Sequence, residues 1–246
     1  MHLVYKFTLS EKEIYVLASL MGKEFVTGIT GRTENENRLI PKEEIRAIVN
    51  SLEKREWIRY DFNGVVAIAS HIRYPLEILA NPKSLLLISC PDDPDHGSDV
   101  YRFFSDSCSV ESRYHAGTDR YEISVEKPIS VEDYYSALLM CYKMVAPSRR
   151  SARIPASALL QVKELLRDNK EKAAREHIRQ LIEDEDDADK LIKVIQGRYT
   201  PVIVKEYRRV GYRLVLMTSD ILLGSENGRV RLRCENGNMV RYEIFG

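Results

Sequence analysis

Helical and strand-like patterns of apolar residues alternate twice along the chain. Apolar positions three or four residues apart predict helices, whereas short alternating or uniformly apolar runs predict strands. One block of helices precedes strands in Ser84–Lys127, and a second block precedes strands in Thr200–Phe245. The sequence therefore predicts one plan built twice, a set of helices followed by an antiparallel meander.

The first helical block begins with a clear start signal. Ser10 and Glu13 have the spacing of a capping box, in which each side chain satisfies a free backbone N–H. Pro41 opens a second helix at a position where its missing N–H costs nothing. Asn63-Gly64 then predicts a tight turn that joins two strands into a hairpin. Helix, helix and hairpin is the outline of a winged helix.

The remaining elements follow the same patterns. Further helices are expected at Ile72–Ala80, Ser130–Met144, Pro155–Arg167, Glu171–Glu183 and Asp187–Gln196. The first meander is expected to contain Ser84–Cys90, Val100–Ser107, Val110–His115 and Arg120–Glu126. The second is expected to contain Val202–Arg208, Tyr212–Thr218, Arg229–Cys234 and Met239–Phe245. The segment Pro147–Arg153 is predicted to be a basic linker.

Short connections between neighbouring strands make both sheets antiparallel, so the predicted class is α+β. The expected architecture is two antiparallel β-meanders with helical segments in a quasi-two-fold arrangement, preceded by a winged-helix-like portion. Its expected segments are the winged-helix-like portion (1–82), the first sheet with its following helix (83–146), a helical bundle (147–198) and the C-terminal sheet (199–246). We expect these segments to pack as one compact domain.

Composition and charge narrow the classes of function. Lysine plus arginine equals aspartate plus glutamate, 37 of each, so the formal net charge is zero. Nucleic-acid binders usually carry a basic excess, because phosphate contacts supply most of their non-specific affinity. The longest apolar run is far short of a bilayer span, and the N-terminal ten residues do not have the pattern of a signal peptide. We therefore expect a cytoplasmic protein with reduced cysteines and no membrane partner.

No familiar catalytic motif stands in the sequence. It contains no GxSxG, HExxH, phosphate-binding loop or dinucleotide glycine fingerprint. The segment Asp92–Asp99 holds four aspartates and His96, but Pro94 breaks any calcium-loop spacing. We expect this segment to be a solvated loop and expect no cofactor or resident metal. A non-enzymatic role follows as the leading expectation, with an enzyme of unrecognised type left as an alternative.

The winged-helix outline raises DNA binding as an alternative function. The candidate contacts are the basic residues of the second helix and the hairpin: Lys42, Arg46, Lys54, Arg55 and Arg59. Four glutamates on the same element, Glu43, Glu44, Glu53 and Glu56, would repel phosphates unless they face away. Winged helices also serve as protein-interaction modules, so the outline does not decide between the two roles.

Aromatic side chains gather on the first meander and the helix after it. Tyr101 and Phe103 share one face of their strand while Phe104 takes the other, so the aromatic residues cannot all enter one core. Tyrosine is favoured at protein interfaces because it combines a large apolar area with a polar tip. Tyr101 and Phe103 are therefore candidate partner-binding residues, and the alternative is that they seal the sheet against its helices.

The order of elements resembles EspG-type chaperones of type VII (ESX) secretion. Leu9–Leu17 corresponds to the first helix of that family, Val49–Leu52 through Ala67–Ala69 to its helix and hairpin, and Leu76–Pro82 to a helical stretch that ends in a proline. Sheet, helical bundle and closing sheet complete the same plan over nearly the whole chain. The resemblance is one of architecture, without a residue-by-residue signature.

The resemblance implies a cytosolic protein that binds a helical secretion substrate, of LXG/WXG100 or PPE type, and keeps it soluble before export. In that family a loop of the central sheet and the C-terminal helical bundle grip the substrate. The corresponding regions here are Asp92–Asp99 and Ala158–Ile195. Candidate partner-binding residues from these regions are Asp95, His96, Leu166, Ile178 and Ile182. The alternative function is that of a winged-helix transcription regulator.

Overall fold

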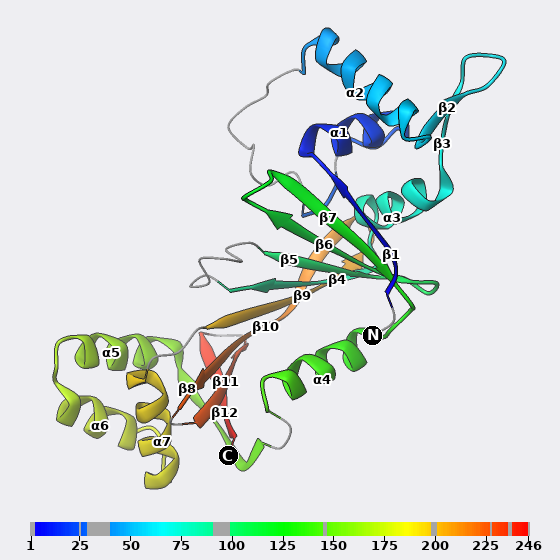
Figure 1. The fold of residues 1–246 in the computed structure, drawn as a ribbon. Helices are drawn as coiled ribbons and strands as arrows, with labels where there is room; N and C mark the ends of the chain where they lie inside the picture. Colours follow the sequence, from blue (N-terminus) through cyan, green and yellow to red (C-terminus); the bar gives the residue numbers. More distant parts are fainter. Residues whose placement is uncertain are drawn as a thin grey trace. The chain divides into compact units, whose positions relative to one another are not determined.

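The protein is described from a computed structural model, which covers residues 3–24, 26–28, 40–90, 99–144, 147–197, 201–226, 228–235 and 238–245. The described chain divides into two compact units, each discontinuous in sequence. The first unit contains β1, α1–α3, β2, β3 and β5–β7 (Figure 1). The second contains α4, β8, α5–α7, β11, β12 and most of β10, and the strands β4 and β9 are divided between the units.

Helices and a hairpin form one part of the first unit. The helices are α1 (Glu11–Leu20), α2 (Lys42–Lys54) and α3 (Ser70–Ala80), and the hairpin is β2 (Ile58–Tyr60) with β3 (Val66–Ile68). The predicted capping box of α1 is present: the Glu13 amide donates to the Ser10 hydroxyl and the Ser10 amide to the Glu13 carboxylate. The hairpin turn is held by Asp61, whose carboxylate accepts the amides of Asn63 and Val65.

The sheet of the first unit is antiparallel throughout. It runs in the order β1 (Leu3–Leu9), β7 (Arg120–Glu126), β6 (Ser109–His115), β5 (Val100–Phe104). Alternate residues of β7 are buried, as expected for a strand with one face against a core. That core joins strands to helices through Leu9, Ile14, Leu17, Leu76, Leu79, Phe103, Val110 and Ile123. The strand β1 is an addition to the elements expected from the sequence.

The second unit has a sheet with helices on both faces. The sheet runs in the order β10 (Arg213–Ser225), β11 (Gly228–Glu235), β12 (Met239–Phe245), β8 (Pro147–Pro155), with every ladder antiparallel. The helices α5 (Ala156–Arg167), α6 (Glu171–Arg179) and α7 (Glu185–Gln196) cover one face, and α4 (Val131–Cys141) packs on the other (Figure 1). Apolar side chains line the face toward α5–α7, and charged side chains line the face toward α4.

Two strands of the second unit depart from the sequence expectation. The segment predicted to be a basic linker is β8, which pairs with β12 over most of its length. Prolines are poor strand formers, and the run of serines and arginines between them lacks the apolar alternation of a strand, so β8 is stabilised by pairing with its neighbour. The strand expected at Tyr212–Thr218 continues to Ser225 because residues after Thr218 pair with β11. The strand β4 (Ser84–Ser89) lies where expected, and β9 (Val202–Val210) runs two residues past its expected end. The α+β class and the antiparallel pairing are confirmed.

Candidate partner-binding surfaces

A cavity of about 510 Å³ opens at one end of the sheet of the second unit. Its lining comes from four strands: Arg153 of β8, Met217 and Thr218 of β10, Arg233, Cys234 and Glu235 of β11, and Met239 of β12. Two methionines make the wall deformable, since the thioether side chain is flexible and polarizable. Two guanidinium groups border the same space. The cavity is suited to an apolar side chain that is followed by an acidic or polar group.

Apolar side chains extend from the cavity along β10. Val215, Leu216 and Met217 are 41%, 48% and 51% exposed. Neighbouring residues of a strand point to opposite faces, so exposure of all three means that this part of β10 is uncovered on both faces within its unit. An exposed run of this kind is a feature of interaction surfaces and is rarely left uncovered in a folded protein.

A buried ionic cluster supports the strands beside the cavity. Asp220 is 1% exposed and accepts hydrogen bonds from Arg231 (2.8 and 3.0 Å) and from Arg233 (2.9 and 3.0 Å). The Tyr135 hydroxyl of α4 also donates to this carboxylate, and the Arg231 guanidinium lies over the Tyr135 ring. Burial, followed by the negative charge of Asp220, raises the pKa of Tyr135 well above its usual range. The tyrosine therefore stays a neutral donor.

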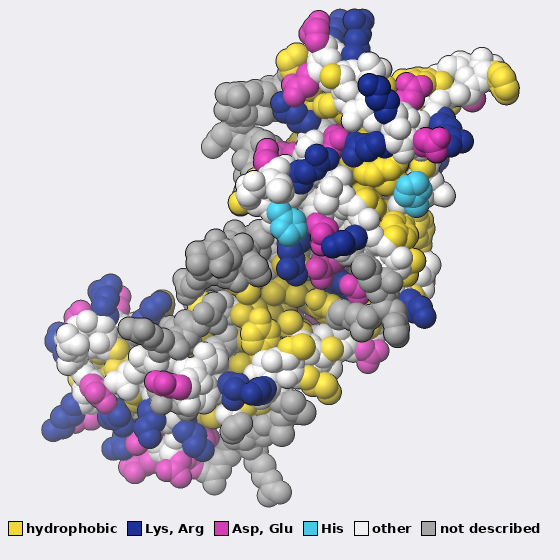
Figure 2. Space-filling model, in the orientation of Figure 1, with side chains coloured by type: hydrophobic (Ala, Val, Ile, Leu, Met, Phe, Trp, Pro, Cys, Tyr) yellow, Lys and Arg dark blue, Asp and Glu magenta, His cyan; other side chains and the backbone are white. Residues whose placement is uncertain are grey.

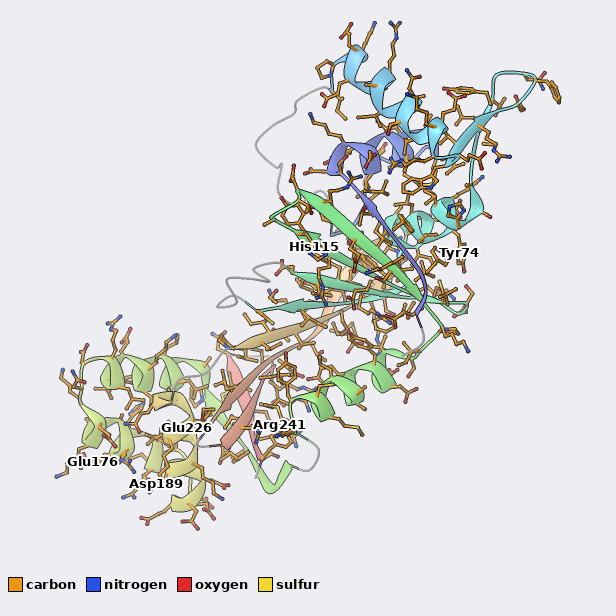
Figure 3. The ribbon with its side chains drawn as sticks, in the orientation of Figure 1. Tyr74, His115, Glu176, Asp189, Glu226 and Arg241 are labelled. Carbon is orange, nitrogen blue, oxygen red and sulfur yellow. The ribbon has the colours of Figure 1, made fainter. Side chains whose placement is uncertain are left out.

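The helical layer presents a charged outer surface. Figure 2 shows lysine, arginine and acidic side chains over α5–α7, and Figure 3 labels Glu176 and Asp189 on this layer. Arg175 donates to Glu171 and to Asp189, which links α6 to α7. The apolar side chains of these helices instead point at the sheet, with Leu160 (64% exposed) as an exception on α5.

Three of the predicted partner-binding residues on this layer belong to the core. Ile178 and Ile182 are 0% and 3% exposed, and Leu166 packs against the same cluster, which includes Val230 and Tyr242 of the sheet. The apolar periodicity of these helices reflects their packing on their own sheet. Contact of these residues with a partner remains a prediction, and the side chains of Ile178 and Ile182 are almost fully buried in the unit.

The two predicted partner-binding residues of the first meander, Tyr101 and Phe103, differ in burial. Phe103 is 0% exposed, whereas Tyr101 is half-buried and stacks on it with ring centroids 6.4 Å apart. The Tyr101 ring lies against Gly28, where a β-carbon would come within 2.6 Å of the ring. Phe103 thus supports the fold, and Tyr101 packs against the segment after α1. Asp95 and His96 lie outside the described residues.

The residues considered for DNA binding do not form one free basic surface. Lys42, Arg46 and Lys54 are exposed on α2. Arg55, however, is bound to Glu13 and lies 4.0 Å above the Trp57 ring, and Arg59 pairs with Glu56 at 3.2 Å.

The tip of the hairpin is apolar. Phe62 is fully exposed, Val65 is 61% exposed and Tyr60 is 50% exposed. Figure 2 shows hydrophobic side chains at the far end of the hairpin. Arg59 is the one basic residue in the hairpin, and it is already paired with Glu56. A wing that entered a DNA groove would be expected to carry basic side chains at its tip.

Sequence reasoning missed the residues that form the cavity. One signal was present: Leu214–Met217 is an unbroken apolar run inside a segment predicted to be a strand, which is more than one buried face requires. The contribution of Arg153, Arg233 and Met239 depends on the register of β8, β11 and β12, which the sequence does not show.

Metal and membrane features are few in the part of the chain that the structure describes. It holds no group of three or more histidine, cysteine, aspartate or glutamate side chains placed to bind a metal ion. The acidic segment after β4 falls outside the described residues. None of the described helices has both the length and the hydrophobicity needed to span a bilayer.

Comparison with known proteins finds a similar fold among solved structures but no similar sequence. No family model matches the sequence, and no curated protein matches it at a significant level. Among solved structures, the chain is similar to the Mycobacterium tuberculosis type VII secretion system chaperone EspG5, solved in complex with the PE25-PPE41 dimer. The TM-score is 0.65 at 13% sequence identity, with 98% of this chain and 90% of that chain covered. The chain therefore has an EspG-like fold.

Proposed function

We propose that this protein is a cytosolic chaperone or adaptor, which binds a helical protein destined for export by a type VII-like system and keeps it soluble. The observation that carries the proposal is the similarity to EspG5, which extends over nearly the whole chain. That chaperone was solved with a PE25-PPE41 dimer, so a PPE-like helical protein is the expected substrate class. The proposal assigns the protein no catalytic step.

The surface features of the second unit support this role. A chaperone must cover apolar surface of its client, and β10 offers exposed Val215, Leu216 and Met217 beside a cavity with deformable walls. We place an apolar side chain of the client between Met217 and Met239, with Arg153 and Arg233 bordering a neighbouring polar group. The buried Asp220 cluster keeps the strands that carry these residues in register.

DNA binding is less well supported as a function. Two of the five basic candidates are engaged in ion pairs within the unit, and the tip of the hairpin is apolar. An exposed aromatic tip without basic neighbours fits an apolar protein surface better than a phosphate backbone.

Co-expression with helical proteins encoded beside its gene tests the proposal. We expect one such protein to co-purify with the chain and to precipitate when expressed alone. Met217→Glu should reduce recovery of the complex at least about tenfold, because a charged side chain would replace the apolar contact with the client and would compete for the guanidinium groups of Arg153 and Arg233. Met140→Glu is the matched control, since Met140 is 59% exposed on α4 and does not line the cavity.

The two outcomes separate the function from the site. Failure of every neighbouring helical protein to associate with the unmodified chain would overturn the chaperone function. A stable complex that tolerates Met217→Glu as well as it tolerates Met140→Glu would keep the function and reject the cavity as its site. Circular dichroism on both variants verifies that the fold is intact.

A further inference from the structure

The strand β8 forms an open edge of the sheet of the second unit. It pairs with β12 on one side, and among the described residues no strand pairs with its other side. An edge strand presents every second pair of N–H and C=O groups outward, where they can bond to another extended chain. Prolines stand only at the two ends of β8, at Pro147 and Pro155, so the backbone between them keeps its donors.

Positive charge is concentrated at this edge although the whole chain is neutral. Arg153 of β8 lies directly opposite Arg241 of β12 in the ladder, an arrangement that costs stability because like charges face each other. Both side chains are accessible, with Arg153 67% and Arg241 43% exposed. The strand also contains Arg149 and Arg150 in its sequence and no acidic residue.

The neighbouring carboxylates compensate only part of this charge. Arg153 uses its Nε to bind Glu235 at 2.7 Å, which leaves both Nη groups outside that contact. Arg241 donates to the Ser151 hydroxyl and is 3.9 Å from Glu243, whose carboxylate already accepts from Arg231 at 3.2 Å. The two arginines thus have donors to offer a further carboxylate (Figure 3 labels Arg241).

The type of charge indicates what the edge would bind. Charged side chains on edge strands commonly prevent aggregation, and lysine is the usual residue for that purpose. Arginine differs because its planar guanidinium matches a carboxylate with two parallel hydrogen bonds. Side chains of an added strand repeat on one face every second residue, so its carboxylates would be spaced two residues apart.

We propose that the open edge of β8 takes an extended acidic segment of a partner protein as an additional strand. Backbone hydrogen bonds to β8 hold this segment, and the carboxylate that lies opposite Arg153 binds its guanidinium, while Arg241, one strand farther in at the same position, adds to the attraction. The proposal deepens the proposed function, because it gives the client an extended acidic segment next to the helices that the cavity region binds. It rests on that function for its context, but its test needs no helical client.

A short synthetic peptide tests the edge directly. The probe is a nine-residue peptide of alternating threonine and glutamate, labelled with fluorescein, and its binding to the full chain is followed by fluorescence anisotropy. A peptide of alternating threonine and lysine is the charge control. A third peptide keeps the glutamates but is N-methylated at every second residue, which removes the backbone donors of one edge while leaving the charge unchanged.

We expect the acidic peptide to bind and the lysine peptide not to bind. N-methylation and Arg153→Glu should each weaken binding at least about tenfold, and Arg241→Glu should act in the same direction. Arg167→Glu is the matched control for net charge, since Arg167 is exposed on α5 and lies 3.9 Å from Asp168.

Three results would overturn the proposal. The first is no binding of the acidic peptide to the unmodified chain. The second is equal binding of the N-methylated peptide, which would indicate simple attraction between opposite charges. The third is an equal loss in Arg153→Glu and Arg167→Glu. None of these results bears on whether a helical client co-purifies, so the chaperone function is tested separately.

Discussion

Each of the two meanders buries one charged side chain between its strands, and the two buried charges have opposite signs. In the first unit a fully buried arginine, Arg102, is surrounded by the carboxylates of Glu111 and Glu126 on the next two strands. In the second unit a buried aspartate, Asp220, is surrounded by Arg231 and Arg233. Each ion links neighbouring strands of its own sheet. A buried charge is tolerated in each case because its partners satisfy it on several sides.

The groups around the two buried ions differ in how well other partners or water could satisfy them if the ion were removed. The partners of Arg102 are two acids, 20% and 13% exposed, and Ser109 adds a hydroxyl at 2.9 Å. Around Asp220, Arg231 keeps a second partner in Glu243, and Arg233 is 36% exposed and so retains contact with water. The first meander should therefore depend more strongly on its central ion than the second.

Arg102→Met is expected to cause the largest loss of stability. It removes the buried cation between two partly buried carboxylates and leaves Glu111 with only the half-exposed Arg113, a change that typically costs about 3–5 kcal/mol. Urea unfolding followed by Trp57 fluorescence measures it, since Trp57 is the single tryptophan and belongs to the first unit. A loss below about 1 kcal/mol would contradict the importance assigned to this ion. Arg113→Met is the control, because Arg113 is 39% exposed and pairs with Glu111 as well.

Asp220→Asn is expected to have an intermediate effect, about 2–3 kcal/mol, because the charge is lost while one oxygen remains to accept hydrogen bonds. Circular dichroism, which reports both units, should record the loss, and the transition of Trp57 in the first unit should move less than it does in Arg102→Met. An equal shift of the Trp57 transition in both variants would show that the contrast between the meanders is wrong. Asp189→Asn provides a surface control, since Asp189 is 32% exposed.

Sequence patterns were sufficient for the elements with local signals. The capping box at Ser10 and Glu13 places α1, and the Asn63-Gly64 turn places the hairpin, because both depend on residues close in sequence. The strand β8 was missed for the opposite reason. Its prolines disfavour a strand locally and its polar run shows no apolar alternation, so only pairing with β12 makes it one.

The candidate site was harder to predict than the fold. Ile178 and Ile182 were taken from the helical region that the family resemblance implies for binding, but apolar helical spacing is the same for a face that packs on the protein's own sheet and for one that binds a partner. Arg102 and Asp220 were not singled out either. A charged residue in a strand is usually solvent-facing, and only the register that brings Arg102 opposite Glu111 shows that it is paired and buried.

The smallest expected effect is on pH dependence, and it arises in the first meander. The hydrogen bond from Arg102 lowers the pKa of Glu126 below its usual value. Burial acts in the opposite direction, and the positive charge of the guanidinium adds to the lowering. A carboxyl with a lowered pKa in the folded state adds stability that is present at neutral pH. That stability is lost as the pH falls, first because the unfolded chain takes up the proton and finally when the folded protein does.

We therefore expect the urea midpoint of the Trp57 transition to fall between pH 7 and pH values below the ordinary glutamate pKa of 4.5. Glu126→Gln should lower the midpoint at pH 7 and flatten this dependence, since the titrating partner of Arg102 is removed. Glu122→Gln serves as the control, because Glu122 lies on the same strand and pairs with the exposed Lys6. If Glu126→Gln keeps the full acid dependence of the unmodified chain, the Arg102 cluster is not its source, and the contrast between the two meanders would then rest on the substitutions alone.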